Sequence, residues 1–286
     1  MSITKKKEDG FISWKISKKI LSTEDYKLNN RIAKKYSKEN INKLAKKYTH
    51  IKPEHINFLL KTNSKIWKNL KGLGADLGGG IGLLSSVIAK KKDIKKIYWF
   101  EKVKNAVTKC QPRVKKKILN KKAKKVISVL GSFDHIELKK SSLDFCIAWD
   151  AMHHSEDLVK TLIGIKKVLK KNGKLIIVDR AHNNDTSNAE IQRMLNIVYS
   201  KEFLRENYLP INKKLTRKMN GEREYRYSDW EKNFKKSGFK IEEVIIVKEK
   251  HKKVLYKKND NKINEKIVNF SIGGFERKKI IYMLKK

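Results

Sequence analysis

An α/β fold is predicted for most of this 286-residue chain: a doubly wound, mostly parallel sheet of seven strands, one terminal strand being antiparallel. From Gly72 onwards, short apolar runs alternate with amphipathic stretches, which is the pattern of βαβ units in a parallel sheet with both faces covered. Two further apolar runs lie near the C-terminus without a helix-sized segment between them. The five earlier runs are GADLG, KIYWFE, VISVLG, LDFCIAWD and KLIIVD.

The first 70 residues show a different pattern. Apolar side chains such as Ile32, Tyr36 and Ile41 recur at helical spacing, and no strand alternation is visible. We expect residues 1–70 to form an N-terminal helical cap on a domain of residues 71–286.

Three elements of the second domain are predicted from local signals. A helix is expected over 155–171, with Ser155 as its N-cap and lysines in its last turn. Strands near 241–247 and 279–284 should pair antiparallel at a sheet edge. Residues 181–227 form an insertion, which we interpret as a lid.

The formal net charge of +40 would ordinarily indicate a nucleic acid or an anionic membrane surface as partner. However, lysine greatly outnumbers arginine and recurs along nearly the whole chain, together with many Ile and Asn residues. A/T-rich codons produce this composition, whereas proteins that bind phosphates usually cluster arginine. A solvated basic surface and a specific polyanion site therefore both remain open.

The compartment is predicted from what the sequence lacks. No apolar run is long enough to span a bilayer, and the basic N-terminus has no apolar signal-peptide core. Cys110 and Cys146 are the only cysteines, which argues against a disulfide framework and a zinc site. We expect a cytoplasmic protein without a metal site.

The segment Ala75–Gly82 (ADLGGGIG) is a glycine-rich turn after a predicted strand. It lacks the third glycine of G-x-G-x-x-G, because Leu83 occupies that position, and it lacks the Gly-Lys-Ser/Thr of a P-loop. Instead, Asp76 is followed by glycines at every second position, which suits a ligand that lies flat across the turn without phosphates.

The DLGGGIG segment resembles motif I of the class I S-adenosylmethionine-dependent methyltransferases, and the resemblance extends over roughly residues 70–286. It implies a Rossmann-like fold, S-adenosyl-L-methionine as cofactor and close approach of the cofactor to the turn. The family's ribose-binding carboxylate corresponds to Glu101 in YWFEKV, and its adenine site to Ser132 and Phe133, although Asp is commoner at the first of these two positions. The cofactor-binding residues implied are Asp76, Gly78, Gly79, Gly80, Gly82, Glu101, Ser132, Phe133 and Trp149.

The end of the fourth predicted strand, in LDFCIAWDAMHH, corresponds to the variable active-site segment of that family. Open α/β sheets bind ligands at the carboxyl ends of their strands. Asp150, His153 and His154 are therefore the candidate catalytic residues, and either histidine is suited to act as a general base near neutral pH. A structural role, such as packing under the cofactor or capping a helix, is the alternative.

The predicted insertion is rich in arginine beside aromatic residues, in the stretch RKMNGEREYRYSDW. This composition suits either an anion-binding lid or a solvated loop. The candidate substrate residues are Arg217, Arg223, Tyr225 and Arg226.

Three functions are compatible with these motifs. We favour a methyltransferase for a small molecule, possibly anionic, because the 150–154 segment resembles that of metabolite-modifying members. Methylation of RNA or DNA is the alternative that the charge supports; against it, neither the Asn/Asp-Pro-Pro-aromatic motif nor a Pro-Cys nucleophile is present. A non-catalytic protein that binds S-adenosylmethionine is the third.

Overall fold

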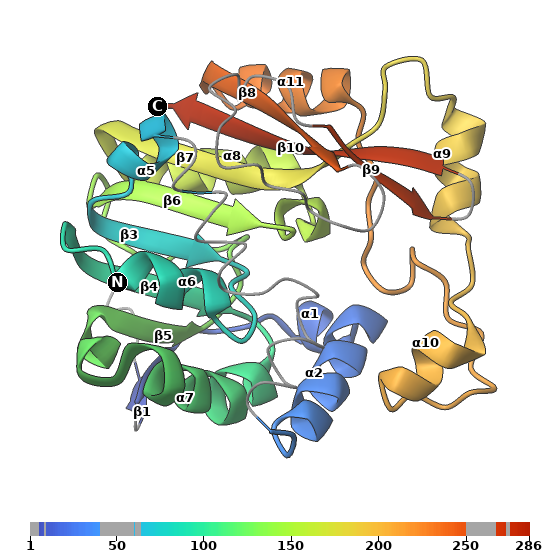
Figure 1. Ribbon diagram of the computed structural model, residues 1–286, viewed down its shortest axis with the longest axis horizontal. Helices are drawn as coiled ribbons and strands as arrows, with labels where there is room; N and C mark the ends of the chain where they lie inside the picture. Colours follow the sequence, from blue (N-terminus) through green and yellow to red (C-terminus); the bar gives the residue numbers. More distant parts are fainter. Residues whose placement is uncertain (1–5, 9, 41–59, 61–63, 250–266, 273–274) are drawn as a thin grey trace.

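The computed structural model describes residues 6–8, 10–40, 60, 64–249, 267–272 and 275–286 (Figure 1). The strands are β1 (Lys6–Glu8), β2 (Phe11–Ser13), β3 (Gly72–Leu77), β4 (Ile94–Glu101), β5 (Val126–Leu130), β6 (Leu143–Trp149), β7 (Leu169–Ala181), β8 (Lys240–Glu249), β9 (Ile267–Ile272) and β10 (Phe275–Lys285). The α-helices are α1 (Lys18–Ser22), α2 (Glu24–Tyr36), α5 (Ser64–Asn69), α6 (Leu83–Ala89), α7 (Gln111–Val114), α8 (Leu158–Val168), α9 (Asn188–Leu195), α10 (Lys201–Glu206) and α11 (Tyr227–Lys236). Short π or 3₁₀ turns are η1 (Ala106–Cys110), η2 (Lys115–Leu119), η3 (Asn120–Lys125) and η4 (Met152–His154).

The described strands form one sheet in the order β1-β2-β5-β4-β3-β6-β7-β10-β8-β9. Its central part, β5-β4-β3-β6-β7-β10-β8, has the seven predicted strands. The pairings from β5 to β7 are parallel, and β10 lies antiparallel to both β7 and β8. The predicted Rossmann-like, doubly wound sheet with an antiparallel terminal strand is thus confirmed. Its chain order reverses beside β3, since β4 lies on one side of it and β6 on the other.

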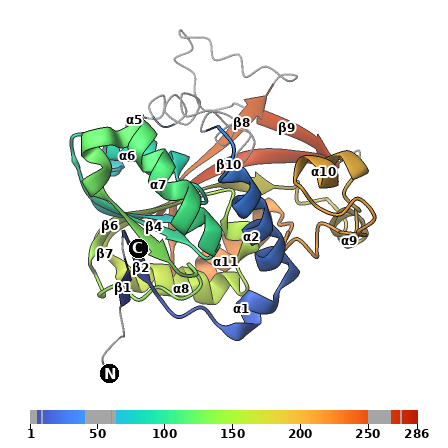
Figure 2. The same cartoon turned by 90° about the horizontal axis from the view of Figure 1, so that it is seen from below.

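Helices cover both faces of the sheet, with α6 and α7 on one side and α8 and α11 on the other (Figure 2). The strands explain this arrangement, because alternate side chains point to opposite faces. In β6, Phe145 and Ile147 belong to the core beneath α6, while Cys146 and Ala148 belong to the core beneath α8. Among the described helices, none has the length and apolar character needed to cross a lipid bilayer.

The N-terminal segment differs from the helical prediction for residues 1–70. Residues 6–8 and 11–13 are strands, and β2 pairs in parallel with β5, so the sheet is extended at this edge. These strands have only three residues each, too few for an alternation to be recognised. The predicted helical character holds for α1 and α2. Ile41 lies outside the described residues, and the division into a cap and a second domain stays a prediction.

The helix predicted over 155–171 is shorter than expected. It is α8, and its N-cap is Asp157, whose carboxylate accepts the backbone N–H of Lys160 at 3.1 Å. Ser155 is not the cap, because its hydroxyl binds the Asp134 carboxylate at 2.9 Å. The helix ends at Val168, where β7 begins. In the predicted insertion, residues 181–227, the structure places helices α9 and α10.

Candidate active site

The glycine-rich turn connects β3 to α6 with a backbone that side chains rarely permit. Gly78, Gly80 and Gly82 have φ of +71°, +54° and +88°, in the left-handed region that favours glycine. At Gly82 a Cβ atom would lie only 1.3 Å from the Trp99 ring. Gly82 therefore packs against Trp99, while Gly78, Gly79 and Gly80 line a cavity.

Asp76 stabilises the turn through hydrogen bonds with the residues that follow it. Its Oδ2 accepts the backbone N–H of Ser85 at 3.1 Å and the Ser85 hydroxyl at 2.6 Å, which ties the end of β3 to the first turns of α6. Burial raises the pKa of Asp76 to about 7. Its other oxygen, Oδ1, is buried without a hydrogen-bond partner in the described part of the chain, although Asp76 borders the cavity.

Glu101 ends β4 and supports the same turn. Its carboxylate accepts the N–H of Gly80 at 3.0 Å and the N–H of Val103 at 2.8 Å. Burial raises the pKa of Glu101 above its usual value. The side chain is 8% exposed and is not among the residues that border the cavity. A cofactor role for Glu101 stays a prediction.

Ser132 and Phe133 follow β5, as expected, but they lie behind the turn. The Ser132 hydroxyl accepts the N–H of Asp134 at 3.1 Å. Phe133 is buried in the core beneath α8 and lies against the position that a Cβ of Gly78 would occupy. Neither residue is among those that border the cavity, so the predicted adenine site also stays untested.

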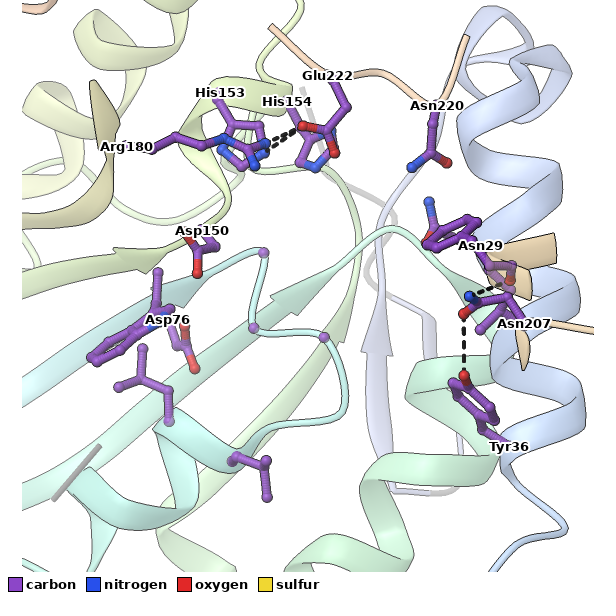
Figure 3. A pocket seen from close by; sticks show the side chains of 18 of the residues that line it. Asn29, Tyr36, Asp76, Asp150, His153, His154, Arg180, Asn207, Asn220 and Glu222 are labelled. Atoms are coloured by element: carbon purple, nitrogen blue, oxygen red, sulfur yellow. Dashed lines mark hydrogen bonds and ion pairs between the residues drawn. The ribbon is translucent and has the colours of Figure 1, made fainter. Parts of the chain in front are cut away.

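The cavity, of about 400 Å³, opens where β3 and β6 end. This is the point at which the strand order reverses, where open α/β sheets bind ligands. Figure 3 shows His153, His154, Arg180 and Glu222 gathered on one side, Asp76 and Asp150 below them, and Asn29, Tyr36 and Asn207 on the far side. The remaining lining residues include Asn220, Trp149, Leu83, Leu84, Tyr199 and Phe203.

Trp149 and Asp150, which follow one another at the end of β6, also line the cavity. The indole Nε1 of Trp149 is buried and has no hydrogen-bond partner among the described residues. Asp150 has a left-handed φ of +48°, and its carboxylate binds the Lys279 ammonium at 2.5 Å. That ammonium also lies 5.5 Å from the centre of the Trp149 ring. Lys279 therefore links β10 to this part of the site.

The two histidines stack side by side, with ring centroids 4.2 Å apart. His153 Nδ1 lies 2.8 Å from Asp179 Oδ1, and His154 Nδ1 lies 3.0 Å from the carbonyl oxygen of Gly221. Burial, together with the nearby positive charge of Arg180, lowers the pKa of His153 well below its usual value. His153 is thus neutral at physiological pH.

Arg180 and Glu222 are cavity residues that the sequence analysis did not single out. They form an ion pair, and Glu222 also lies 3.3 Å from Arg217 and 3.8 Å from His153 Nε2. Burial would raise the pKa of Glu222, but Arg180 and its other neighbours hold it below the usual value. Arg180 ends β7, next to Asp179, whereas Glu222 comes from the predicted insertion.

None of the four predicted substrate residues borders this cavity. Arg217 is buried and forms ion pairs with Glu222 and Glu224. Arg223 lines a separate, smaller hollow, and Tyr225 packs on Trp230. Arg226 contacts Asp229 at the start of α11. Their assignment to the substrate stays a prediction, while Asn220 and Glu222 of the same segment do reach the cavity.

Comparisons with known proteins match this fold and its turn. Residues 75–177 match the family model described as "Methyltransferase domain". The chain is similar to the YcgJ protein of Bacillus subtilis, with 13% identity and a TM-score of 0.54, over 82% of this chain and 99% of that one. A geranyl diphosphate methyltransferase in complex with S-adenosylmethionine has 9% identity and a TM-score of 0.54, over 82% and 86%.

A protein of Galdieria sulphuraria, provisionally described as a sarcosine dimethylglycine methyltransferase, has 19% identity and a TM-score of 0.50. This similarity covers 67% of the chain but only 62% of that protein. No curated protein sequence matches the chain. Residues 75–177 therefore match a methyltransferase domain, and the chain has the fold of these methyltransferase structures.

Proposed function

We propose that this protein transfers a methyl group from S-adenosylmethionine to a small-molecule acceptor bound in the β3–β6 cavity. The observation that carries the proposal is the continuity of the cavity, which joins the glycine turn to the two histidines. A volume of about 400 Å³ is in the range of small-molecule sites. The match to the methyltransferase family model, over residues 75–177, includes both the glycine turn and the two histidines.

The residues at the cofactor end fit S-adenosylmethionine. The bare backbone of Gly78–Gly80 allows a flat ligand to approach. Two buried polar atoms there, Asp76 Oδ1 and Trp149 Nε1, have no hydrogen-bond partner among the residues that the structure describes. They can respectively accept and donate a hydrogen bond to the cofactor's amino-acid part. Glu101 retains lone pairs for ribose hydroxyls next to the two N–H groups that it already accepts.

The cofactor supplies an activated methyl group, which an acceptor atom takes as the carbon–sulfur bond breaks and the acceptor–carbon bond forms. The protein must hold these atoms in line and exclude water. We assign the acceptor to the side of the cavity formed by Asp150, His153 and His154. A neutral imidazole there can take the proton that the acceptor loses. Arg180 is the guanidinium that borders the cavity, and it would favour an anionic acceptor.

The ribose assignment predicts that Glu101→Ala weakens S-adenosylmethionine binding by more than about tenfold, because hydrogen bonds to a carboxylate contribute about 1.5–3 kcal/mol. Isothermal titration calorimetry measures this affinity. Glu202→Ala, in the exposed first turn of α10, is the matched control and should bind as the natural protein does. Equal affinities for both variants would disprove the ribose assignment.

RNA or DNA methylation remains the second candidate, because one hollow is lined by five cationic side chains of α2 and the residues after it. These are Lys27, Arg31, Lys34, Lys35 and Lys38. The deciding experiment incubates the protein with S-adenosylmethionine labelled in its methyl group and with a cell extract, followed by nuclease digestion. We expect label in small, nuclease-resistant molecules. Label that is released by nuclease would overturn the small-molecule proposal.

We also propose that the protein works in the cytoplasm, where cysteines stay reduced. Cys110 and Cys146 are both buried and free, and they belong to cores on opposite faces of the sheet.

A further inference from the structure

We propose that His153, His154 and Glu222 form a binding site for one divalent transition-metal ion, of the class of Zn²⁺ or Fe²⁺, at the acceptor side of the cavity. Each residue contributes one ligand atom, and the three atoms all lie within 4.8 Å of one another. Figure 3 shows the three side chains facing one another at the cavity wall. Two imidazoles and one carboxylate are a ligand set used for both zinc and non-haem iron.

The first supporting observation is the orientation of the imidazoles. A carbonyl oxygen only accepts hydrogen bonds, so His154 Nδ1, 3.0 Å from Gly221 O, must carry a hydrogen. Asp179 likewise accepts from its neighbours, namely the N–H groups of Arg180 and His153. We assign the hydrogen of the 2.8 Å contact between His153 Nδ1 and Asp179 Oδ1 to the imidazole.

Both Nε2 atoms are consequently left with a lone pair. Metal-binding histidines almost always donate their other ring N–H to a carboxylate or a backbone carbonyl, which fixes the tautomer and the ring. His153 has the carboxylate, and His154 has the carbonyl. Both rings therefore already make the hydrogen bonds that orient metal-binding histidines.

The second observation is the spacing of the ligand atoms. His153 Nε2 lies 3.8 Å from Glu222 Oε2, which is too far for a hydrogen bond. Two ligand atoms at about 2.1 Å from one tetrahedral ion are about 3.4 Å apart. Closing this pair onto an ion therefore takes a shift of a few tenths of an ångström, and a pair at the 4.8 Å limit takes a shift of about 1.4 Å.

Positively charged side chains surround His153, His154 and Glu222, and their contacts must change when a metal ion binds. The contacts of Glu222 with Arg180, Arg217 and His153 all reach Oε2, so ligation of an ion by this oxygen requires the two guanidinium groups to move away from it. Lys279 is neutralised by Asp150, and Arg217 by Glu224. Arg180 is the cation closest to the site, and its charge must be offset by Glu222 and Asp179.

An ion at this position would also take part in the proposed methyl transfer. Only this catalytic role, and not the binding of the ion, rests on the proposed function. The acceptor would be an oxygen compound that ligates the ion through a hydroxyl group. Coordination lowers the pKa of such a hydroxyl, which loses its proton to solvent before the oxygen–methyl bond forms. His153 and His154 would then be ligands, and neither would accept the proton.

The test uses Co²⁺ as a spectroscopic probe. The full-length protein is treated with a chelator, dialysed and titrated with Co²⁺, while visible absorption reports nitrogen and oxygen coordination. We expect one equivalent to bind, and we expect His154→Ala and Glu222→Gln each to weaken binding by at least about tenfold. His135→Ala, which removes an exposed histidine away from the cavity, should bind Co²⁺ as the natural protein does.

Two results would overturn the proposal: no stoichiometric Co²⁺ binding by the natural protein, or equal binding by His154→Ala and Glu222→Gln. Circular dichroism shows whether each variant is folded, and Glu222→Gln keeps the shape of the side chain. Calorimetry with S-adenosylmethionine, performed on the same samples, separates the two proposals. Co²⁺ binding without S-adenosylmethionine binding supports the metal site and contradicts the proposed methyltransferase activity.

Discussion

At the residue scale, Asp76 is a cavity side chain whose charge changes near neutral pH. Its carboxyl group is buried, and this raises its pKa to about 7. Below that value it is protonated, and above it the ionised group attracts a positively charged sulfonium ligand. We predict that S-adenosylmethionine binds more tightly as the pH rises from about 6 to about 8, by up to about tenfold, measured by calorimetry at each pH.

The control for this prediction is Asp76→Asn, which keeps an oxygen for Ser85 but cannot ionise. Its affinity for S-adenosylmethionine should change little over the same range of pH. If Asp76→Asn retains the full pH dependence of the natural protein, then a group other than Asp76 causes that dependence.

The cofactor end of the site was easier to predict than the acceptor end. Asp76 and Gly78–Gly80 lie within five positions of the sequence, and so their spacing alone predicts a turn at the cavity. Arg180 and Glu222 are far apart in the sequence and meet because β7 ends beside the segment before α11. No local pattern signals such a pair. The arginine-rich composition of that segment drew attention to Arg217, whereas the acidic residue next to the arginines is the one that reaches the cavity.

At the scale of elements, the chain offers two glycines whose replacement should have opposite effects. In α8, Gly164 is in the helix interior, and a Cβ there would meet nothing within 4 Å. Gly164→Ala should therefore raise the free energy of unfolding by about 0.5–1 kcal/mol. At Gly82 a Cβ would overlap the Trp99 ring, so Gly82→Ala should lower it by more than about 2 kcal/mol.

Urea denaturation of both variants, followed by circular dichroism, measures these changes. A Gly82→Ala protein as stable as the natural one would mean that Trp99 can move away without cost. In that case the close packing of the turn on β4 would not explain why this position is glycine.

The limits of helices and strands depended on tertiary contacts that the sequence does not display. Ser155 has the chemistry of an N-cap, but its hydroxyl is used by Asp134 and Thr161, and Asp157 caps α8 instead. Similarly, β2 is a strand because β5 offers an unpaired edge. The longer apolar runs of β6 and β7 were recognisable because they are buried on both faces of the sheet.

At the scale of the whole molecule, the parallel sheet follows from the alternation of strands and helices, which was visible in the sequence. Alternating elements favour a parallel sheet with helices on both faces, and the reversal of strand order beside β3 then places the cavity. The net charge of +40 does not predict the arrangement of the sheet or the place of the cavity. Its distribution gives the basic hollow beside α2, where five cationic side chains gather.

The net charge predicts how binding should depend on salt. This dependence distinguishes long-range attraction of DNA from binding in the cavity. The protein should bind random-sequence duplex DNA at low salt. Its affinity should fall by about 10³-fold or more between about 50 and 200 mM salt, as expected for a complex held by many phosphate contacts. Salt should change S-adenosylmethionine binding less than threefold or so, because the cavity is partly shielded from solvent ions.

Fluorescence anisotropy with labelled DNA and calorimetry with S-adenosylmethionine, over the same series of salt concentrations, provide the two measurements. Replacing Lys27, Arg31 and Lys34 by Gln should reduce the dependence of DNA binding on salt and leave the affinity for S-adenosylmethionine unchanged. These three residues line the basic hollow and do not border the cavity. DNA affinity that persists at high salt would instead indicate contacts of defined geometry, and it would favour a nucleic acid as the methyl acceptor.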